Sequence, residues 1–280
     1  LPLSHIGGIA VIIRALIYGF GVNLVEKFDP VYINAQIDGG NVSIISVVPT
    51  MLQKLLESRN FNPFPETLRA ILLGGGPAPD SLLKLCLNKN IPIARTYGMT
   101  ETCSGIVGLW LNENPCKVKF VGKPFQDVSL SVKNGEILIS GPLVMKGYLN
   151  EIETSGVHNS HDLGWIDDDG YLFLEMRRKD LIITGGENVS PVEIENILLQ
   201  HQHIRDCAVT GIPDNKWGQK IIGVIVKEKN QPLADVTLKN WCKSRLVDYK
   251  IPKHFISLEK IPRNELGKID QKILEKITLN

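Results

Sequence analysis

The strongest constraint on the fold is an alternation, early in the chain, of short apolar runs typical of strands with segments of helical periodicity. Residues 42–48 have the composition of a buried strand that stops at Pro49, and apolar residues then recur at helical spacing over 50–58. The order repeats, with a strand predicted at 68–73, a helix at 81–87 and a further strand at 91–94. This alternation favours an α/β fold with a parallel sheet covered by helices.

The pattern changes after Gly122. Short strands follow one another with turn residues and no helix between them, at 128–132, 135–140 and 170–174. This spacing predicts a small antiparallel sheet or barrel that begins at about residue 120.

A second, smaller domain is predicted from Lys179 to the end of the chain. Ser190 is a good helix cap, with Pro191 in the first turn and Glu193 three residues after the cap. Strands are then predicted at 207–210, 221–226 and 254–258, and helices at 237–246 and from about 270. Residues 179–280 are therefore expected to form an α+β unit, separate from 1–178.

Composition excludes several classes of partner. The 31 basic and 30 acidic residues give a net charge of +1, which argues against nucleic acid as the main partner. The most apolar stretch, 6–22, contains Arg14 and falls short of the ~20 apolar residues that a membrane span needs. The five cysteines form no C-x-x-C pair, which favours a reduced compartment and argues against zinc.

The start of the chain indicates a piece of a longer protein. The first residue is Leu1 rather than Met, and the segment that follows has no signal-peptide pattern. With the cysteine usage, this favours the cytoplasm or the plastid stroma.

Four motifs are unusual in combination, although the two general nucleotide-binding patterns, G-x-G-x-x-G and G-x-x-x-x-G-K-[ST], are absent. In chain order they are Gly-Gly-Gly-Pro-Ala-Pro at 74–79, Tyr-Gly-Met-Thr-Glu at 97–101, Arg-Arg-Lys-Asp-Leu-Ile-Ile-Thr-Gly-Gly-Glu-Asn at 177–188 and Pro-Arg-Asn-Glu-Leu-Gly-Lys at 262–268. With these motifs, the chain from Leu1 to about Ile273 resembles the adenylate-forming enzymes, the superfamily of acyl-CoA synthetases, adenylation domains and firefly-type luciferases. Segments 1–8, 98–104 and 180–188 are most similar to the o-succinylbenzoate–CoA ligases of menaquinone and phylloquinone synthesis.

The resemblance implies a nucleotide site in 1–178, as the C-terminal part of a large AMP-binding domain. Adenine would lie between the glycine segment and the Tyr97 segment, with Tyr97 stacked on the base, Thr100 on the α-phosphate and Asp162 on the ribose hydroxyls. Each residue also has an ordinary structural interpretation, as a turn glycine, a half-buried aromatic or a turn aspartate. The implied nucleotide-binding residues are Gly74, Gly75, Gly76, Tyr97, Gly98, Met99, Thr100, Asp162 and Arg177.

The resemblance also assigns the chemistry. Glu101 is a hard oxygen ligand of the kind that Mg²⁺ prefers. Lys268 would draw the substrate carboxylate toward the α-phosphate of ATP and offset the developing charge. His5 would close the acyl pocket, Lys179 would be the hinge between the domains, and Gly186 would line the tunnel for coenzyme A. Most lysines are solvated surface residues and a histidine beside an apolar run is more often structural.

Four further positions bear on the resemblance. His161 stands where the family usually has Gly, and Met176 replaces the Gly that commonly precedes the nucleotide-contacting arginine. Arg178 competes with Arg177 for that role, but the spacing to Lys179 favours Arg177. Arg14 would meet either the second carboxylate of o-succinylbenzoate or an acid such as Glu26.

The expected function is therefore an ATP-dependent acid–CoA ligase that uses Mg²⁺, ATP, coenzyme A and a carboxylic acid, most simply o-succinylbenzoate. The expected partners are small molecules and, in an open alternative, a second copy of the chain. Another acyl- or aryl-CoA synthetase remains an alternative. So does a truncated, non-catalytic adenylate-binding fragment, because the family's Ser/Thr/Gly-rich loop that cradles the β- and γ-phosphates would precede His5.

Overall fold

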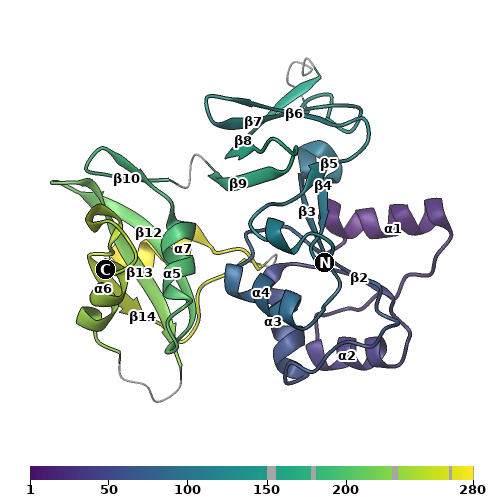
Figure 1. Ribbon diagram of the computed structural model, residues 1–280, viewed down its shortest axis with the longest axis horizontal. Coiled ribbons are helices and arrows are strands. Elements are labelled where there is room, and N and C mark those ends of the chain that lie inside the picture. Colours follow the sequence, from purple (N-terminus) through teal and green to yellow (C-terminus); the bar gives the residue numbers. More distant parts are fainter. Residues whose placement is uncertain (150–155, 178–180, 229–232, 265–266, 280) are drawn as a thin grey trace. The chain divides into compact units, whose positions relative to one another are not determined.

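The computed structural model describes the chain except for residues 150–155, 178–180, 229–232, 265–266 and 280 (Figure 1). The chain divides into two compact units, Leu1–Leu174 and Glu175–Asn280. The boundary predicted between 178 and 179 falls among residues outside the described part.

The first unit contains the predicted α/β layer. Its five-stranded sheet has the order β1-β2-β3-β4-β5, with β1 (Ile44–Val47), β2 (Ala70–Leu73), β3 (Ile93–Met99), β4 (Ser104–Trp110) and β5 (Lys123–Pro124). The helices are α1 (Ile6–Tyr18), α2 (Pro30–Asp38), α3 (Pro49–Ser58) and α4 (Asp80–Asn88). Strands β1, β2 and β3 pair in parallel, as predicted, whereas β4 pairs antiparallel with both β3 and β5.

Strand β3 differs from the sequence expectation. The prediction ends this strand at residue 94, but the strand continues to Met99 because β4 returns beside it, with Tyr97 opposite Val107 and Met99 opposite Ser104. Strand β4 was not predicted from the sequence. The Tyr97 segment therefore begins inside β3, and Thr100 and Glu101 follow the strand.

The α/β layer is held by a continuous apolar core. On α3, Leu52, Leu55 and Leu56 are fully buried at the helical spacing expected from the sequence, and they pack in one cluster with Ile71 of β2 and Ile93 of β3. Burying a side chain of this size contributes about 1.5–3 kcal/mol. This helix–sheet packing fixes the end of β2, which the glycine segment follows, and the end of β3, in which Tyr97 lies.

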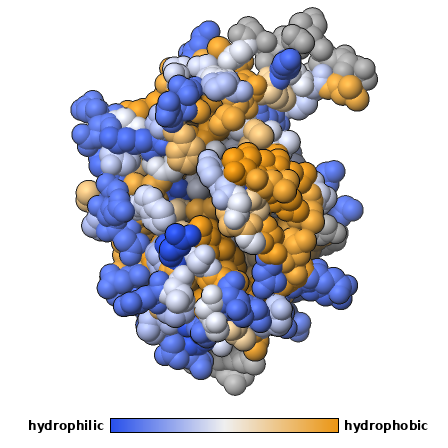
Figure 2. All heavy atoms as spheres, turned by 90° about the vertical axis from the view of Figure 1, so that its right-hand side faces the viewer, coloured by the Kyte–Doolittle hydropathy of each residue, from blue (hydrophilic) through white to orange (hydrophobic). Residues whose placement is uncertain are grey.

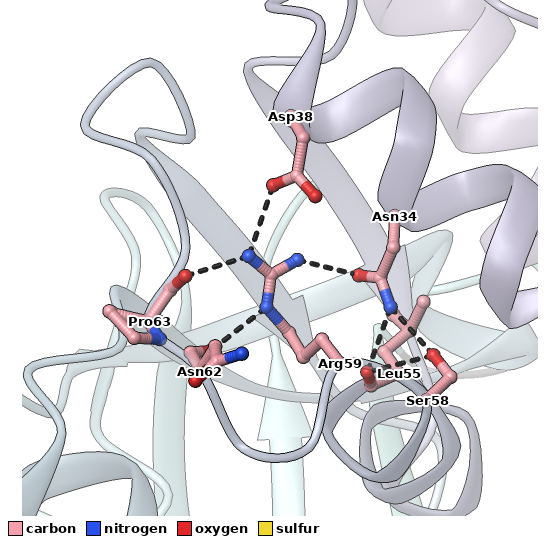
Figure 3. Close-up of polar contacts among 7 residues, drawn as sticks. All are labelled: Asn34, Asp38, Leu55, Ser58, Arg59, Asn62 and Pro63. Atoms are coloured by element: carbon pink, nitrogen blue, oxygen red, sulfur yellow. Dashed lines mark hydrogen bonds and ion pairs between the residues drawn. The ribbon is translucent and has the colours of Figure 1, made fainter.

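Arg59, at the end of α3, joins this helix to α2 (Figure 3). The Arg59 guanidinium donates to Asn34 Oδ1 at 2.9 Å and to Asp38 Oδ1 at 3.0 Å on α2, and to the backbone oxygens of Asn62 and Pro63. It also lies 4.2 Å from the centre of the Phe64 ring. Four hydrogen bonds to α2 and to the segment after α3 engage all three guanidinium nitrogens, which gives Arg59 a structural role.

A second sheet, which lies in the first unit except for the end of β9, has the order β6-β7-β8-β9, with β6 (Ser129–Lys133), β7 (Glu136–Ser140), β8 (Val157–Ile166) and β9 (Leu172–Arg177). The pairs β6–β7 and β7–β8 are antiparallel, which confirms the predicted change of texture. Strand β8 was not predicted because its central residues, Asn159, Ser160, His161 and Asp162, are polar. Ser160 and Asp162 are polar yet buried, so the apolar pattern typical of a strand is missing from this part of β8.

The second unit is an α+β unit, as predicted. It contains β10 (Ile182–Thr184), β11 (Glu187–Val189), α5 (Pro191–Leu198), β12 (Ile204–Asp214), β13 (Gly218–Lys227), α6 (Asp235–Lys243), β14 (His254–Ser257) and α7 (Gln271–Leu279). The predicted cap of α5 is confirmed, since Ser190 Oγ accepts from the Glu193 backbone N–H at 3.3 Å. Strands β12 and β13 form a long antiparallel pair, and β14 adds to β13 in parallel.

Helix α1 carries an exposed apolar surface. Figure 2 shows an apolar patch on the side of the molecule where α1 lies in Figure 1. Leu16 is 80% exposed, Ile17 68% and Tyr18 76%. Among the described helices, none combines the length and the apolar character that crossing a membrane requires.

Candidate nucleotide-binding site

Two predicted nucleotide-binding residues, 65 positions apart in sequence, meet in the core of the first unit. The Tyr97 hydroxyl on β3 donates to Asp162 Oδ2 on β8 at 2.7 Å. Tyr97 is 9% exposed and Asp162 8%. A hydrogen bond to a charged group in such a place contributes about 1.5–3 kcal/mol, so it joins the two sheets and fixes one carboxylate oxygen.

The burial of Tyr97 bears on its expected role. Its ring packs in the apolar cluster beneath the second sheet, with Ile106, Val107 and Ile139 among its members. Little of the ring remains open for stacking on a base. The described geometry favours a positioning role for Tyr97, through its hydroxyl on Asp162, and stacking stays a prediction.

An irregularity in β8 presents Asp162. The register between β7 and β8 shifts between Glu136 and Leu138, because additional residues of β8 lie opposite that interval. The Asp162 backbone N–H donates to Ser160 Oγ at 3.1 Å, and that hydroxyl donates to the Ile137 carbonyl at 2.8 Å. Bulges of this kind redirect a side chain next to functional sites.

His161 occupies the bulge in the left-handed region, at φ +55°. Glycine adopts this conformation without a Cβ penalty, so the structure explains why a glycine suits this position. The side chain lies outside the core, with Nδ1 3.4 Å from Glu136 Oε1. The bulge forms with a histidine at this position, and Asp162 makes its hydrogen bonds to Tyr97 and Ser160.

The three glycines at 74–76 have three different surroundings. A side chain on Gly74 would collide with Thr96 of β3, and Gly75 has φ +79°. Gly76 is exposed and has open space where a side chain would begin. Close packing and turn geometry account for the first two, whereas the surroundings of Gly76 would accommodate a side chain, and a role of Gly76 beside a nucleotide stays a prediction.

A strained turn follows β3 and carries Thr100 and Glu101. The short helix η1 (Thr100–Thr102) ends in two successive residues with positive φ, Cys103 at +54° and Ser104 at +92°. Thr102, fully buried, holds the turn: its hydroxyl accepts from the Met99 backbone N–H at 3.0 Å. Left-handed residues other than glycine concentrate at functional sites.

Glu101 receives a partner that the sequence analysis missed. The Tyr148 hydroxyl donates to Glu101 Oε1 at 2.8 Å, and the Met145 backbone N–H donates to the Glu101 carbonyl at 2.8 Å. Among the described residues there is no cluster of three or more metal-ligating side chains. One carboxylate fits Mg²⁺ only in the mode in which substrate phosphates and water complete the octahedron.

His5 lies at the start of α1. Its backbone carbonyl accepts from Gly8 N–H at 3.0 Å and from Ile9 N–H at 3.1 Å, and the side chain, which makes no capping bond, is half-buried. In the described part of the chain no ion pair joins Arg14 to Glu26, which was one of the two alternatives for Arg14.

The second unit presents Lys268 on a tight turn. The Lys268 backbone N–H donates to Asn264 Oδ1 at 3.1 Å, its carbonyl accepts from Asn264 N–H at 2.8 Å, and Gly267 has φ +75°. Lys268 is exposed. Arg177 ends β9, its side chain lies outside the description, and the expected hinge Lys179 lies outside the described residues.

Gly186 forms a two-residue hairpin turn with Gly185 between β10 and β11. Their φ angles are +85° and +61°, and the Gly185 backbone N–H donates to the Trp217 carbonyl at 2.8 Å. A hairpin turn with two left-handed residues favours glycine, so local geometry accounts for both. A role of Gly186 in a tunnel stays a prediction.

Comparison with known proteins places both units in one family. Residues 1–149 match the AMP-binding enzyme family, and residues 193–268 match the AMP-binding enzyme C-terminal domain. The chain belongs to the AMP-binding enzyme family. Its similarity to curated and solved AMP-binding enzymes extends over the whole chain.

Three of these matches are informative. The 2-succinylbenzoate–CoA ligase of a Geobacillus species is 39% identical over 100% of this chain and 60% of its own length. The o-succinylbenzoate CoA synthetase of Bacillus subtilis, solved with its acyl-adenylate intermediate, is 39% identical with a TM-score of 0.88, over 98% of this chain and 59% of that one. The same synthetase solved with ATP and magnesium gives 38% identity and a TM-score of 0.87, over 100% and 60%. The chain thus spans about 60% of the length of the curated relatives it matches.

Proposed function

We propose that the protein to which this chain belongs is an ATP-dependent acid–CoA ligase that converts o-succinylbenzoate to its coenzyme A thioester. The observation that carries the proposal is the similarity, across both units, to 2-succinylbenzoate–CoA ligases at 37–39% identity. The meeting of Tyr97 and Asp162 supports it from the structure, because it provides a buried carboxylate of the kind that can accept from both ribose hydroxyls.

The proposed reaction has two half-reactions. A carboxylate oxygen of the acid attacks the α-phosphorus of ATP, and pyrophosphate leaves to give an acyl-adenylate. The sulfur of coenzyme A then attacks the acyl carbon, loses its proton, and AMP leaves. Asp162 and Thr100 would hold the nucleotide in both steps, with Arg177 and the backbone at Gly76 beside it.

Lys268 is proposed to act in the first half-reaction only. The joining of a carboxylate to a triphosphate brings two anions together, and a long ammonium side chain offsets the charge that builds up. An exposed lysine on a turn can enter and leave such a site. His5 would orient the carboxylate, Lys179 would be the hinge, and Gly186 would line the passage for coenzyme A in the second half-reaction.

Magnesium is proposed as a cofactor on the donor set present. Glu101 supplies one hard oxygen, and Tyr148 orients that carboxylate through a 2.8 Å hydrogen bond. When bound, the ion neutralises charge on the phosphates of ATP. Replacement of Glu101 by Gln should raise the magnesium concentration needed for half-maximal pyrophosphate release.

The deciding experiment measures pyrophosphate release by the complete gene product, with ATP, magnesium and one acid at a time. The panel contains o-succinylbenzoate, benzoate, a medium-chain fatty acid and no acid. We expect release to be fastest with o-succinylbenzoate and a coenzyme A thioester to form when the thiol is added. Faster release with another acid would assign a different acyl- or aryl-CoA synthetase, and release with none would reject the ligase function.

A second candidate concerns the 280 residues by themselves. Since they span about 60% of the length of the relatives, the candidate is a fragment that binds an adenylate without turning over ATP. Calorimetric titration of this chain with AMP and with ATP tests this candidate. Equal affinities would mean that the β- and γ-phosphates find no binding groups here, whereas much tighter binding of ATP would contradict the candidate.

A further inference from the structure

The turn that presents Lys268 is anchored by an arginine with no assigned role in the proposed reaction. The Arg263 guanidinium donates to both carboxylate oxygens of Asp206, at 2.8 and 3.1 Å, and to the Gly267 carbonyl at 3.2 Å. Gly267 directly precedes Lys268. One planar group therefore connects the peptide before Lys268 to strand β12, 57 residues earlier in the chain.

Asp206 is a rigid support for this arginine. It lies on β12, which pairs along its length with β13, and its Oδ1 also accepts from the Cys207 backbone N–H at 2.9 Å. The Asp206 and Arg263 side chains are 35% and 26% exposed. A partly desolvated carboxylate–arginine pair, in which one guanidinium nitrogen contacts both carboxylate oxygens, holds its geometry better than an exposed ion pair does.

The two ends of the turn are fixed independently of the arginine. Ile261 is buried, and Ile269 packs against the same apolar cluster, which includes Leu274 of α7. Arg263 and Ile269 form an isolated antiparallel bridge, and the Asp270 backbone N–H donates to the Pro262 carbonyl at 2.9 Å. Loss of the Arg263 side chain would thus free the Gly267 carbonyl, while the apolar core and the hydrogen bonds of Asn264 to Gly267 and Lys268 still support the turn.

A lysine would not replace this arginine. A lysine ammonium is a compact point charge, whereas the guanidinium fork reaches the carboxylate and the carbonyl at once in fixed directions. An error of about 1 Å in the position of a catalytic group can cost about 100-fold in rate. The cost would fall on the step in which Lys268 acts.

From this geometry we propose that Arg263, held by Asp206, is a positioning residue that sets the place of the Lys268 backbone for adenylate formation. The inference rests on the proposed function of Lys268. Arg263 acts through Lys268 and touches no substrate. It is needed in the first half-reaction and not in the second.

The test is a double-mutant cycle in the complete gene product, with single-turnover rates of both half-reactions. Arg263→Gln and Arg263→Lys should each slow adenylate formation by about 10- to 100-fold, with little change in the KM for ATP. Added to Lys268→Ala, the same changes should slow adenylate formation by less than about 3-fold, because the residue through which Arg263 acts is gone.

Thioester formation from a supplied acyl-adenylate should change by less than about 2-fold. Arg205→Gln, an exposed arginine next to Asp206, is the matched control and should leave both rates unchanged.

Equal slowing of both half-reactions, or equal slowing with and without Lys268, would assign Arg263 a general structural role and overturn the proposal. A second measurement does not depend on activity. In Arg263→Gln, hydrogen exchange of the peptide containing 267–270 should accelerate at least about 5-fold while β12 and β13 stay protected. Unchanged exchange in this peptide would reject the anchor whether or not the protein proves to be a ligase. A wild type that releases no pyrophosphate would reject the ligase function alone, and exchange would still decide on the anchor.

Discussion

The two units hold their candidate functional residues in opposite ways. In the first unit Asp162 is buried, and Tyr97 and Ser160 bond its side chain and its backbone within the core. In the second unit Lys268 is exposed, on a turn whose backbone is fixed by Asn264 and Arg263. A group that must hold the nucleotide throughout a reaction profits from such preorganisation, whereas a group needed in one step must be able to leave.

The largest expected effect comes from Lys268→Ala in the complete gene product. Adenylate formation should slow by ~10²–10³-fold, the range for removal of one preorganised electrostatic group. Thioester formation from the synthetic acyl-adenylate and coenzyme A should be nearly unchanged. Single-turnover measurements of the two half-reactions check this, with Lys272→Ala, another exposed lysine close by, as the control. Equal slowing of both half-reactions would contradict the contrast between the units.

The next largest expected effect is on the stability of the second unit, which carries the Lys268 turn, and it comes from Glu195 on α5. Burial raises the pKa of Glu195 to about 7 from 4.5, although a bond from the Val209 backbone N–H and the charge of Arg263 act against the shift. The folded state therefore binds the proton more tightly than the unfolded state. The stability that this contributes is fully present below pH 4.5 and is lost as the pH rises through about 7.

Glu195→Gln keeps the acceptor for Val209 and removes the titration. At pH 8 we expect the variant to be more stable than the wild type by up to about 3 kcal/mol, and the difference to disappear near pH 4.5. The stability of the second unit is measured by urea unfolding, with hydrogen exchange of β12 peptides as the readout. Glu187→Gln, at an exposed position, is the control. A pH-independent difference would mean that Glu195 is ionised in the folded protein.

A smaller effect is expected for Asp162→Ala. Loss of charge-assisted hydrogen bonds to the ribose should cost about 1.5–3 kcal/mol, or about 10- to 150-fold in AMP affinity. Tyr97→Phe, which removes only the hydroxyl that holds Asp162, should weaken the binding free energy of AMP by about 0.5–1.5 kcal/mol. Calorimetry with AMP measures both, against Asp168→Ala, an exposed acid of the nearby turn. An unchanged affinity in Asp162→Ala would make the buried carboxylate purely structural and remove the contrast with Lys268.

The smallest effect tests the backbone at the bulge. Since His161 has φ +55°, His161→Gly should be more stable than His161→Ala by about 1 kcal/mol. Both variants lose the same exposed contact with Glu136, so the difference reports the backbone alone. Thermal or urea unfolding of the pair measures it. An alanine variant as stable as the glycine variant would show that the bulge relaxes, and AMP affinity should then fall with it.

Much of the fold follows from local sequence. The apolar spacing of Leu52, Leu55 and Leu56 predicts α3, and Ser190 with Pro191 predicts the start of α5, because helix periodicity and capping are decided within a few residues. The strands β4 and β8 escaped prediction for the opposite reason. Their pairing depends on neighbours brought from elsewhere, and β8 is polar at its centre.

The sequence by itself determined the family, the two-part organisation and the residue types of the candidate site, because these reside in contiguous motifs and local periodicity. Only the tertiary structure decided which of those residues cooperate. It joined Tyr97 to Asp162, placed Tyr148 on Glu101, and set Arg263 between Asp206 and the peptide before Lys268. Each of these contacts spans more residues than any sequence motif, or depends on a turn geometry that is fixed by packing, so it exists only once the sheets and the apolar clusters have formed.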